Sequence, residues 1–365
     1  MHKILVLSNH FSGLASFRKE VFVALLKERY QVTIAAPESI ESEIFREMGC
    51  TIIYTRNLNR HGTNPLKDFA LLNEYRRIIR QVKPDIVLTY TIKPNIYGGM
   101  ACKLSRKPYI VNITGLGSAV ENPGILQKLT TTLYQVGMSG ARKIFFQNSA
   151  NRKFFEQHSI RKDIHAQIPG SGVNLTHHSL REYPSNDNPI KFLFISRVMK
   201  QKGIEEYFAA AEHFKGRGME FHILGACEED YSQRINELVD AGVVIYHGKQ
   251  KDVRPFITEA HCLIHPSFYP EGMSNVILES AAAGRPVITT RRPGCQEAVD
   301  DGISGFLITP QDTEDLIKAT ERFVALSHEA KKEMGIAGRK KMEREFDRNI
   351  VVKEYLDAIR VILNK

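Results

Sequence analysis

The sequence predicts an α/β protein of two domains, each built on a parallel β-sheet that is covered by helices. Three observations support this prediction: the length of the chain, the alternation of short apolar runs with amphipathic stretches, and a polar, proline-containing segment near the middle. At 365 residues the chain is long enough for two domains of ordinary size. Its 42% hydrophobic and 25% charged residues are typical of a globular protein.

The first half of the chain alternates between short apolar runs and longer stretches with helical periodicity. Strands that are separated by helices in this way are typical of a parallel sheet covered on both faces. The expected strands are residues 4–7, 32–35, 52–54, 86–89, 109–113 and 144–146. The expected helices include residues 17–28, 42–48, 69–82 and 126–139.

A polar segment with two prolines and no periodicity, residues 179–189, is predicted to be a linker. After it the alternation restarts, which predicts a second domain of the same Rossmann-like class. We therefore expect domains at residues 1–180 and 181–345, with a last helix at 346–365 that packs back toward the first. Sheets of this class bind ligands at the carboxyl ends of their strands, so the active site is expected in a cleft between the two domains. The expected strands of the second domain are residues 192–196, 221–224, 243–246, 262–265, 287–289 and 306–308.

The sequence also predicts a cytoplasmic protein. No stretch approaches the roughly 20 apolar residues that span a bilayer, and the N-terminal residues 1–8 turn polar too soon for a signal peptide. The five cysteines are scattered without a Cys-x-x-Cys pair, which predicts reduced thiols and neither disulfides nor a zinc site.

Positive charge is concentrated in the first half of the chain. Residues 1–180 carry 24 Lys and Arg against 12 Asp and Glu, a net charge of +12, whereas residues 181–365 carry 26 against 29, a net charge of −3. This asymmetry indicates that one domain meets a polyanion: nucleic acid, acidic phospholipid or a diphosphate-bearing substrate. A generally basic, solvated surface is the alternative.

The most informative segment runs from Pro270 to Glu279, between a predicted strand and a helix. Glycine and small polar residues at the start of a helix leave backbone N–H groups pointing outward at the positive end of its dipole, which suits a phosphate. The two carboxylates, Glu271 and Glu279, flank these amides. Because a carboxylate repels phosphate but accepts hydrogen bonds from paired hydroxyls, both are predicted to bind sugar or ribose hydroxyls.

Two cations are predicted to lie beside this segment. Arg197 and Lys202 follow the first strand of the second domain, at its carboxyl end. Arginine offers a planar fork and lysine a point charge to phosphate oxygens. Together with the Glu271 segment they predict a site for a nucleotide diphosphate.

These two motifs, Ser-Arg-x4-Lys-Gly at residues 196–203 and Glu-x7-Glu at 271–279, resemble the fourth family of retaining glycosyltransferases, which has the GT-B fold of two Rossmann-like domains facing a central cleft. The resemblance covers essentially the whole chain. Within the family the chain is similar to bacterial enzymes that assemble lipid-linked glycans and surface polysaccharides, N-acetylgalactosaminyltransferases among them. This resemblance implies transfer of a hexose or N-acetylhexosamine, with GalNAc as the preferred assignment, from a UDP-sugar to an undecaprenyl-diphosphate-linked saccharide.

The resemblance also implies roles for individual residues. Arg197 and Lys202 would bind the donor diphosphate and stabilise the leaving nucleotide, with Glu271 on the transferred hexose. Glu279 would hold the ribose hydroxyls. Further donor contacts would come from the backbone amides of Gly272, Met273, Ser274 and Asn275, from Gly13, and from the base pocket at residues 248–253, which includes Gly248, Lys249 and Val253.

The acceptor side is predicted from residues that follow strands of the first domain. Phe17 and Arg18 resemble the close relatives, Lys93 and Asn95 follow the strand at 86–89, and Asn112 and Thr114 stand where many relatives have a sugar-contacting histidine. The Gly115-Leu116-Gly117 sequence lacks a third glycine, so a dinucleotide site is rejected. The histidines His10, His61, His177, His178 and His265 are predicted to be structural or surface residues.

No Asp-x-Asp motif occurs in the sequence, so we predict no metal and no cofactor. Fixed cations and helix-end amides would then carry the diphosphate charge. The resemblance favours front-face attack, in which the departing phosphate oxygen takes the acceptor proton.

The basic first domain predicts peripheral attachment to the anionic inner face of the cell membrane. The helix at 126–139 would place an apolar face, Leu126, Leu129, Leu133, Val136 and Met138, into the interface; the alternative is that this helix packs on its own sheet. Two other functions stay open: a sugar-nucleotide 2-epimerase of the same fold and a nucleic-acid-binding module. No basic run interleaved with aromatics occurs, so no nucleic acid is expected as a partner. The basic residues of the first domain that are predicted to meet anionic headgroups and the acceptor diphosphate are Arg56, Arg60, Lys67, Arg76, Arg77, Arg80, Lys103, Arg106 and Lys107.

Overall fold

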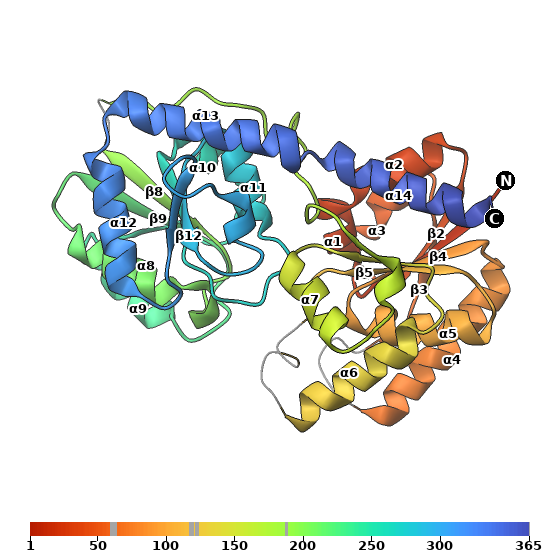
Figure 1. The fold of residues 1–365 in the computed structure, drawn as a ribbon. Coiled ribbons are helices and arrows are strands. Elements are labelled where there is room, and N and C mark those ends of the chain that lie inside the picture. The colour runs from red at the N-terminus through yellow and green to blue at the C-terminus, as the bar shows by residue number, and fades with distance from the viewer. Residues whose placement is uncertain (59–63, 117–119, 121–123, 187–188, 365) are drawn as a thin grey trace. The chain divides into compact units, whose positions relative to one another are not determined.

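The computed structural model describes residues 1–58, 64–116, 120, 124–186 and 189–364. The chain divides into two compact units, one formed by Met1–Ser171 together with Arg348–Lys365 and the other by Gly172–Asp347. Each unit is a parallel β-sheet with helices on both faces (Figure 1). The predicted fold class, two Rossmann-like domains, is thereby confirmed.

The sheet of the first unit has the strand order β3-β2-β1-β4-β5-β6-β7, and all its neighbours are parallel. The short strand β7 (His165–Gln167) adds an edge that the sequence pattern did not predict. The other strands are β1 (Lys3–Leu7), β2 (Gln31–Ala36), β3 (Thr51–Tyr54), β4 (Ile86–Tyr90), β5 (Tyr109–Ile113) and β6 (Lys143–Phe146). The helices are α1 (Phe11–Phe17), α2 (Lys19–Lys27), α3 (Ser42–Glu47), α4 (Pro65–Val82), η1 (Pro94–Gly98), α5 (Gly99–Leu104), α6 (Ile125–Met138), α7 (Ser149–Gln157), η3 (Lys162–Ile164) and α14 (Arg348–Leu363).

The second unit repeats the same topology, with the order β10-β9-β8-β11-β12-β13 and parallel pairing throughout. Its strands are β8 (Ile190–Ile195), β9 (Met219–Leu224), β10 (Ile245–Tyr246), β11 (Cys262–His265), β12 (Val287–Thr290) and β13 (Gly305–Ile308). Its helices are η4 (Lys200–Lys202), α8 (Ile204–His213), α9 (Ser232–Asp240), α10 (Arg254–Glu259), α11 (Asn275–Ala282), η5 (Gln296–Ala298), α12 (Thr313–Ala325) and α13 (His328–Glu345).

The alternation of side chains along each strand separates the core of a unit into two layers. In β1, Leu5 and Leu7 pack with α4, α5 and α6, whereas Ile4 and Val6 pack with α1, α2, α3 and α14. In both sheets the strand order reverses beside the first strand, between β1 and β4 and between β8 and β11. Such a switch point opens a crevice at the carboxyl ends of the strands, where ligands bind in this class of fold.

The boundary between the units differs from the predicted one. The predicted linker packs on the second unit, because the buried guanidinium of Arg285 donates hydrogen bonds to the carbonyl oxygens of Arg181 at 3.3 Å and Glu182 at 2.7 Å. Tyr183 is also buried, and its hydroxyl donates to the carbonyl oxygen of His261 at 2.9 Å. The chain instead changes unit between Ser171 and Gly172.

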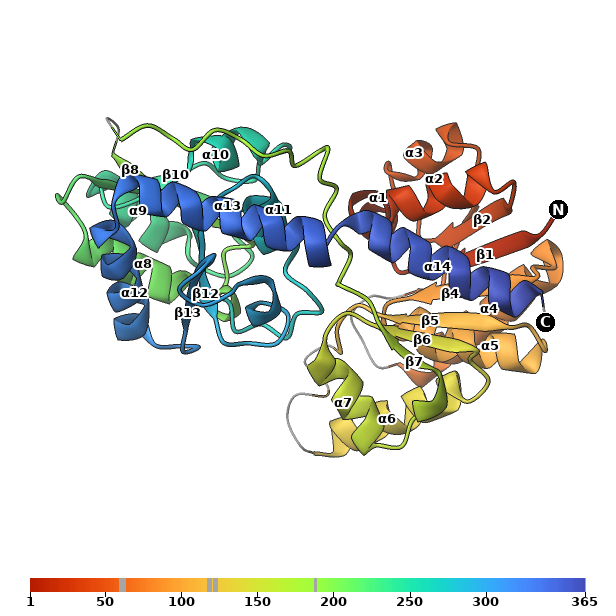
Figure 2. The ribbon, with the colours of Figure 1, turned by 45° about the horizontal axis from the view of Figure 1, so that its top comes forward.

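The last helix belongs to the first unit, where α14 runs beside α2 (Figure 2). Its first residue, Arg348, is buried, and its guanidinium donates to the carboxylate of Glu20 at 2.8 Å. Farther along, Tyr355 is fully buried and donates a hydrogen bond from its hydroxyl to the side chain of Asn112 in β5. The end of the chain therefore completes one face of the first sheet.

Two further features bear on the sequence analysis. The five cysteines are free thiols, and all but Cys227 are buried. Within the described ranges, none of the helices combines the length and the apolar character needed to cross a bilayer.

Candidate functional site

The two predicted cations lie where β8 ends. Arg197 is half-buried, and its guanidinium pairs with the carboxylate of Glu228 at 2.8 Å. Lys202 is buried at the end of the short helix η4. Gly203 follows it with a φ of +78°, and a Cβ there would lie only 2.3 Å from the carbonyl oxygen of Pro266. Glycine at this position lets the lysine turn pack directly against the end of β11.

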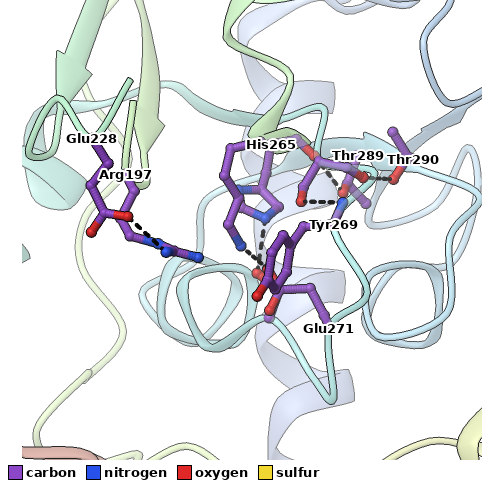
Figure 3. A network of polar contacts seen from close by, with 10 residues as sticks. Arg197, Glu228, His265, Tyr269, Glu271, Thr289 and Thr290 are labelled. Carbon is purple, nitrogen blue, oxygen red and sulfur yellow. Dashed lines mark hydrogen bonds and ion pairs between the residues drawn. The ribbon is translucent and has the colours of Figure 1, made fainter. Parts of the chain in front are cut away.

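Lys202, in the loop after β8, forms an ion pair with Glu271, in the loop between β11 and α11 (Figure 3). Their side chains are only 8% and 17% exposed, so the pair is largely removed from water. Tyr269 stands beside it, with the Lys202 ammonium 4.6 Å and the Arg197 guanidinium 5.4 Å from the centre of its ring. The electron-rich face of a tyrosine attracts cations at this range, so Tyr269 holds two like charges close together.

Helix α11 begins at Asn275, four residues after Glu271. Ser274 precedes the helix in extended conformation, but its side chain makes no capping hydrogen bond to the first turn. Instead its hydroxyl contacts Nε2 of the buried His265 at 3.1 Å. The first amides of α11 are therefore not occupied by this cap, and they lie at the positive end of the helix dipole.

The loop after β12 holds the residues that precede α11 in place through backbone contacts. The amide of Ser274 donates to the carbonyl oxygen of Gly294 at 2.8 Å. Gly294 has a φ of +90°, and a Cβ there would lie 2.8 Å from Cβ of Glu271. Its own amide donates to the carboxylate of Glu297 at 2.8 Å. The Glu271 loop is thus held by backbone contacts that leave no room for a side chain at Gly294.

The remaining donor-side candidates surround this centre within the second unit. Glu279 lies half-buried in the second turn of α11, and Gly272 and Met273 are buried between the two glutamates. Asn275 is the first residue of the helix, and its side-chain oxygen is buried with no hydrogen-bond partner among the described residues. The carbonyl oxygen of Gly248 accepts from the amide of Gly225 at 2.9 Å, which ties the predicted base loop to the end of β9. Lys249 is exposed and Val253 is half-buried.

The candidates that follow β1 in the first unit have local partners. The amide of Gly13 donates to Nδ1 of His10 at 2.9 Å, so this histidine caps α1. Arg18 is buried, with its guanidinium 5.9 Å from the centre of the Tyr90 ring and 6.0 Å from that of Tyr355. Phe17 is half-buried, and its carbonyl oxygen accepts from Arg18 at 2.9 Å.

The amides of Asn95 and Asn112 are also engaged within the first unit. Asn95 accepts from the hydroxyl of Thr89 at 2.8 Å and donates to the carbonyl oxygen of Asn112 at 2.9 Å. Asn112 donates to the carbonyl oxygen of Thr89 at 2.9 Å. Both side chains are buried, so they join β4, β5 and η1. Thr114, just beyond β5, is half-buried.

Lys93 pairs with Asp68 of α4 at 2.7 Å, and the hydroxyl of Tyr97 donates to the other oxygen of that carboxylate at 2.8 Å. The backbone just before Lys93 is unusual. Thr91 has a φ of +71°, which is an outlier for a β-branched residue, and the π-helix η1 follows it. Both features are frequent at functional sites.

Three site residues were not predicted from the sequence. Tyr269 and Asp68 showed no signal, because an isolated tyrosine or aspartate has no spacing that marks it. His265 was expected to be structural, and it contacts Ser274, one of the predicted donor-binding residues.

His61 and Arg60 lie outside the described residues, as does Gly117. Across the described ranges, no cluster of three or more His, Cys, Asp or Glu side chains could hold a metal ion.

Comparison with known sequences gives matches along most of the chain. Residues 189–325 match the family described as "Glycosyl transferases group 1", and residues 3–148 match "Glycosyl transferase 4-like". The chain is 24% identical to the N,N'-diacetylbacillosaminyl-diphospho-undecaprenol alpha-1,3-N-acetylgalactosaminyltransferase of Campylobacter jejuni, over 98% of each protein. It is 22% identical to the capsular polysaccharide biosynthesis glycosyltransferase CapM of Staphylococcus aureus, over 89% of this chain and 91% of that protein.

Solved structures share the fold. A glycosyltransferase from Rickettsia africae superposes with a TM-score of 0.83 at 21% identity, over 99% of this chain and 98% of that one. HepE from Anabaena, solved with UDP-glucose, superposes with a TM-score of 0.81 at 16% identity, over 99% of this chain and all of that one.

We predict that His265 makes stability depend on pH. Burial, with a smaller contribution from the Lys202 charge, lowers the pKa of His265 from 6.5 to about 3. Between these two values the unfolded chain binds a proton that the folded chain does not, so stability falls as the pH falls through this window. Relative to His265→Gln, the wild type should lose about 2 kcal/mol more unfolding free energy between pH 7 and pH 5.

Urea unfolding of both proteins at several pH values measures this difference. Between pH 7 and 9 the two stability curves should run parallel, which serves as the internal control. Parallel curves down to pH 5 would show that His265 does not stay neutral when buried.

Proposed function

We propose that this chain, whose residues 189–325 match the glycosyl transferases of group 1 and whose residues 3–148 match a glycosyl transferase 4-like domain, is a retaining, metal-independent glycosyltransferase of lipid-linked glycan or surface-polysaccharide assembly. Its fold is GT-B, like that of the glycosyltransferase structures that it resembles. The donor we propose is a UDP-sugar that carries a hexose or N-acetylhexosamine, GalNAc first. The acceptor is an undecaprenyl-diphosphate-linked saccharide.

The observation that carries this proposal is the buried Lys202–Glu271 pair beside Tyr269 and Arg197. A diphosphate needs positive charge held in fixed positions, because charge grows on it as the sugar leaves. Lys202 and Arg197 supply this charge from one loop, and the amides at the start of α11 supply partial positive charge from the other. Fixed cations of this kind take the place of a metal ion in our proposal.

The two glutamates are assigned to hydroxyl groups. Glu271 lies in the loop before α11 and pairs with Lys202 of the loop after β8, so we place the junction of the transferred hexose and the diphosphate there. Glu279 lies in the second turn of α11 and would bind the ribose. A carboxylate accepts hydrogen bonds from two neighbouring hydroxyls at once. The ion pair adds a second task for Glu271, since it also positions Lys202.

The transfer step that we propose needs no protein nucleophile. The bond from the anomeric carbon to the diphosphate oxygen breaks, and the acceptor oxygen forms its new bond on the same face of the sugar. The acceptor proton passes to the departing diphosphate oxygen, so that UDP leaves with the proton. Lys202 and Arg197 stabilise the charge that develops on this leaving group.

The lipid-linked acceptor is proposed from the names of the relatives and from the surface of the first unit. The Campylobacter jejuni relative acts on a diphospho-undecaprenol-linked sugar, as its name states. Several basic residues on this unit are exposed and could meet anionic headgroups: Arg56, Lys67, Arg77, Arg80, Lys103 and Arg106. Arg76 and Lys107 are half-buried.

Helix α6 both packs on its sheet and presents apolar side chains to solvent. Met138 is buried and Leu133 packs against the core, so these two predicted membrane contacts belong to the interior instead. The exposed apolar side chains of α6, the α6 apolar face, are Ile125, Leu126, Leu129 and Val136. Leu66 and Phe69 at the start of α4 are also exposed. Apolar side chains with exposed lysines and arginines on the same unit favour an anionic membrane surface as the partner.

A transfer assay tests the proposed reaction. UDP-GalNAc, other UDP-sugars and GDP-mannose are offered with an undecaprenyl-diphosphate-linked saccharide, and the product anomer is read by NMR. We expect transfer from a UDP-sugar with the anomeric configuration retained and with an unchanged rate in EDTA. Inversion of configuration would contradict the mechanism, and interconversion of the sugar nucleotide without transfer would favour the 2-epimerase.

The two glutamates are separated by their kinetic effects. Glu279→Ala should weaken UDP binding by about tenfold or more, because a hydrogen bond to a charged group is worth about 1.5–3 kcal/mol. Glu271→Ala should mainly lower kcat, again by at least about tenfold. Titration calorimetry with UDP and steady-state kinetics measure both effects. Glu314→Ala, on the exposed face of α12, is the control, and unchanged kinetics in both site variants would exclude the assignment.

Membrane binding is tested with vesicles of neutral and anionic phospholipid. Replacing Leu126 and Leu129 with glutamate should reduce binding to anionic vesicles by about tenfold or more, since burying each leucine contributes about 1.5–3 kcal/mol. Ile303→Glu, an exposed apolar residue of the second unit, is the matched control. Equal sedimentation of all three proteins with vesicles would contradict a role for the α6 apolar face.

A further inference from the structure

The contact between His265 and Ser274 is not explained by the roles assigned above. His265 is the last residue of β11 and Ser274 the residue before α11, and both are almost completely buried. Nε2 of His265 lies 3.1 Å from the hydroxyl oxygen of Ser274. Burying a histidine ring costs free energy unless its nitrogens are hydrogen-bonded. The hydrogen bond to Ser274 is therefore the feature that indicates the role of His265.

The hydroxyl of Ser274 is not used as a helix cap. Serine before a helix usually accepts a hydrogen bond from an amide of the first turn. Here the hydroxyl turns toward His265 instead, while the backbone amide of Ser274 is fixed by the carbonyl oxygen of Gly294. Its oxygen therefore lies at the start of α11 without competing for the first amides of the helix.

The direction of the hydrogen bond follows from the surroundings of His265. The ring is neutral, because burial lowers its pKa far below the physiological range. A neutral ring carries one N–H, on either Nδ1 or Nε2. In the described part of the chain Nδ1 has no hydrogen-bond partner. Since an unpaired buried N–H is rarer and more costly than an under-used acceptor, the hydrogen belongs on Nε2, which donates to Ser274.

We infer that His265 turns the Ser274 hydroxyl into a hydrogen-bond donor for the diphosphate of the bound nucleotide. The oxygen of Ser274 accepts from Nε2, so its own hydrogen is left to point away from the histidine. An anion at the amides of α11 is the acceptor that this geometry offers. His265 is then a positioning residue and Ser274 a binding residue. This inference rests on the proposed nucleotide-sugar site.

The first test reads the tautomer directly in the full-length protein. Protein labelled with ¹⁵N at histidine is studied by long-range ¹H–¹⁵N correlation at neutral pH, and the His265 signal is assigned by its loss in His265→Gln. We expect the pattern of a neutral ring protonated at Nε2. A ring protonated at Nδ1 would overturn the inference, because Nε2 would then accept the Ser274 hydrogen and leave none for the ligand.

The second test measures UDP binding by titration calorimetry in a double-mutant cycle. Ser274→Ala should raise the Kd by about tenfold, as expected when a hydrogen bond to a charged group is lost. His265→Leu should raise it several-fold in the wild type but not in the Ser274→Ala protein, because its effect passes through the hydroxyl. His265→Gln should restore binding to within about twofold, since glutamine can place an N–H near the Nε2 position.

An equal effect of His265→Leu in both backgrounds would show a merely structural role and overturn the inference. Failure of the proposed function looks different: the wild type would then bind neither UDP nor GDP. The tautomer measurement needs no ligand, so it still decides the direction of the hydrogen bond in that case.

Discussion

The arrangement of the second unit depends on one largely buried ion pair, Lys202 with Glu271. Taking two charges out of water is costly, and their attraction offsets this cost only when the geometry is held by other contacts. Gly203 packs the lysine turn against Pro266, and Gly294 packs the glutamate loop from the other side. Removing either partner would take away the buried counter-charge of the other. The pair therefore fixes two loops that are 69 residues apart in sequence.

These two loops are neighbours because of the sheet topology. The strand order reverses between β8 and β11, and the loops that leave these two strands at their carboxyl ends go to opposite faces of the sheet. That reversal opens the space in which Lys202, Tyr269 and the start of α11 meet. The first unit has the same reversal between β1 and β4, followed by Arg18 on one side and Lys93 on the other. Similar topology thus supports different chemistry in the two units, since the residues at the strand ends differ.

Much of this arrangement could be predicted from the sequence. The strands of both sheets, β7 excepted, follow from apolar runs of three to five residues, and the predicted donor-side cations, Arg197 and Lys202, follow from motif spacing. The partners of these residues could not be predicted in the same way. Tyr269 can be identified as a site residue only from the structure, which places two cations beside its ring. The predicted linker is instead part of the second unit, because Arg285, which is distant in sequence, donates hydrogen bonds to its carbonyl oxygens. Asn95 and Asn112 look like binding residues in sequence because nothing local shows that they hydrogen-bond within the fold.

The polar side chains at the carboxyl ends of the strands have different kinds of partner in the first unit and in the second. Asn95, Asn112 and Tyr355 satisfy one another across β4, β5 and α14, and Arg18 is covered by two tyrosine rings. The asparagine–tyrosine contacts make this part of the interior rigid and specific, whereas Nε and one terminal nitrogen of Arg18 are buried without a hydrogen-bond partner among the described residues. The backbone of Thr91 is in the left-handed region, which a β-branched residue disfavours. This conformation costs about 1–3 kcal/mol, which the surrounding contacts must offset. The amide of Asn95 donates to the carbonyl oxygen of Thr91 at 3.0 Å, and the Lys93–Asp68–Tyr97 contacts lie directly after this turn.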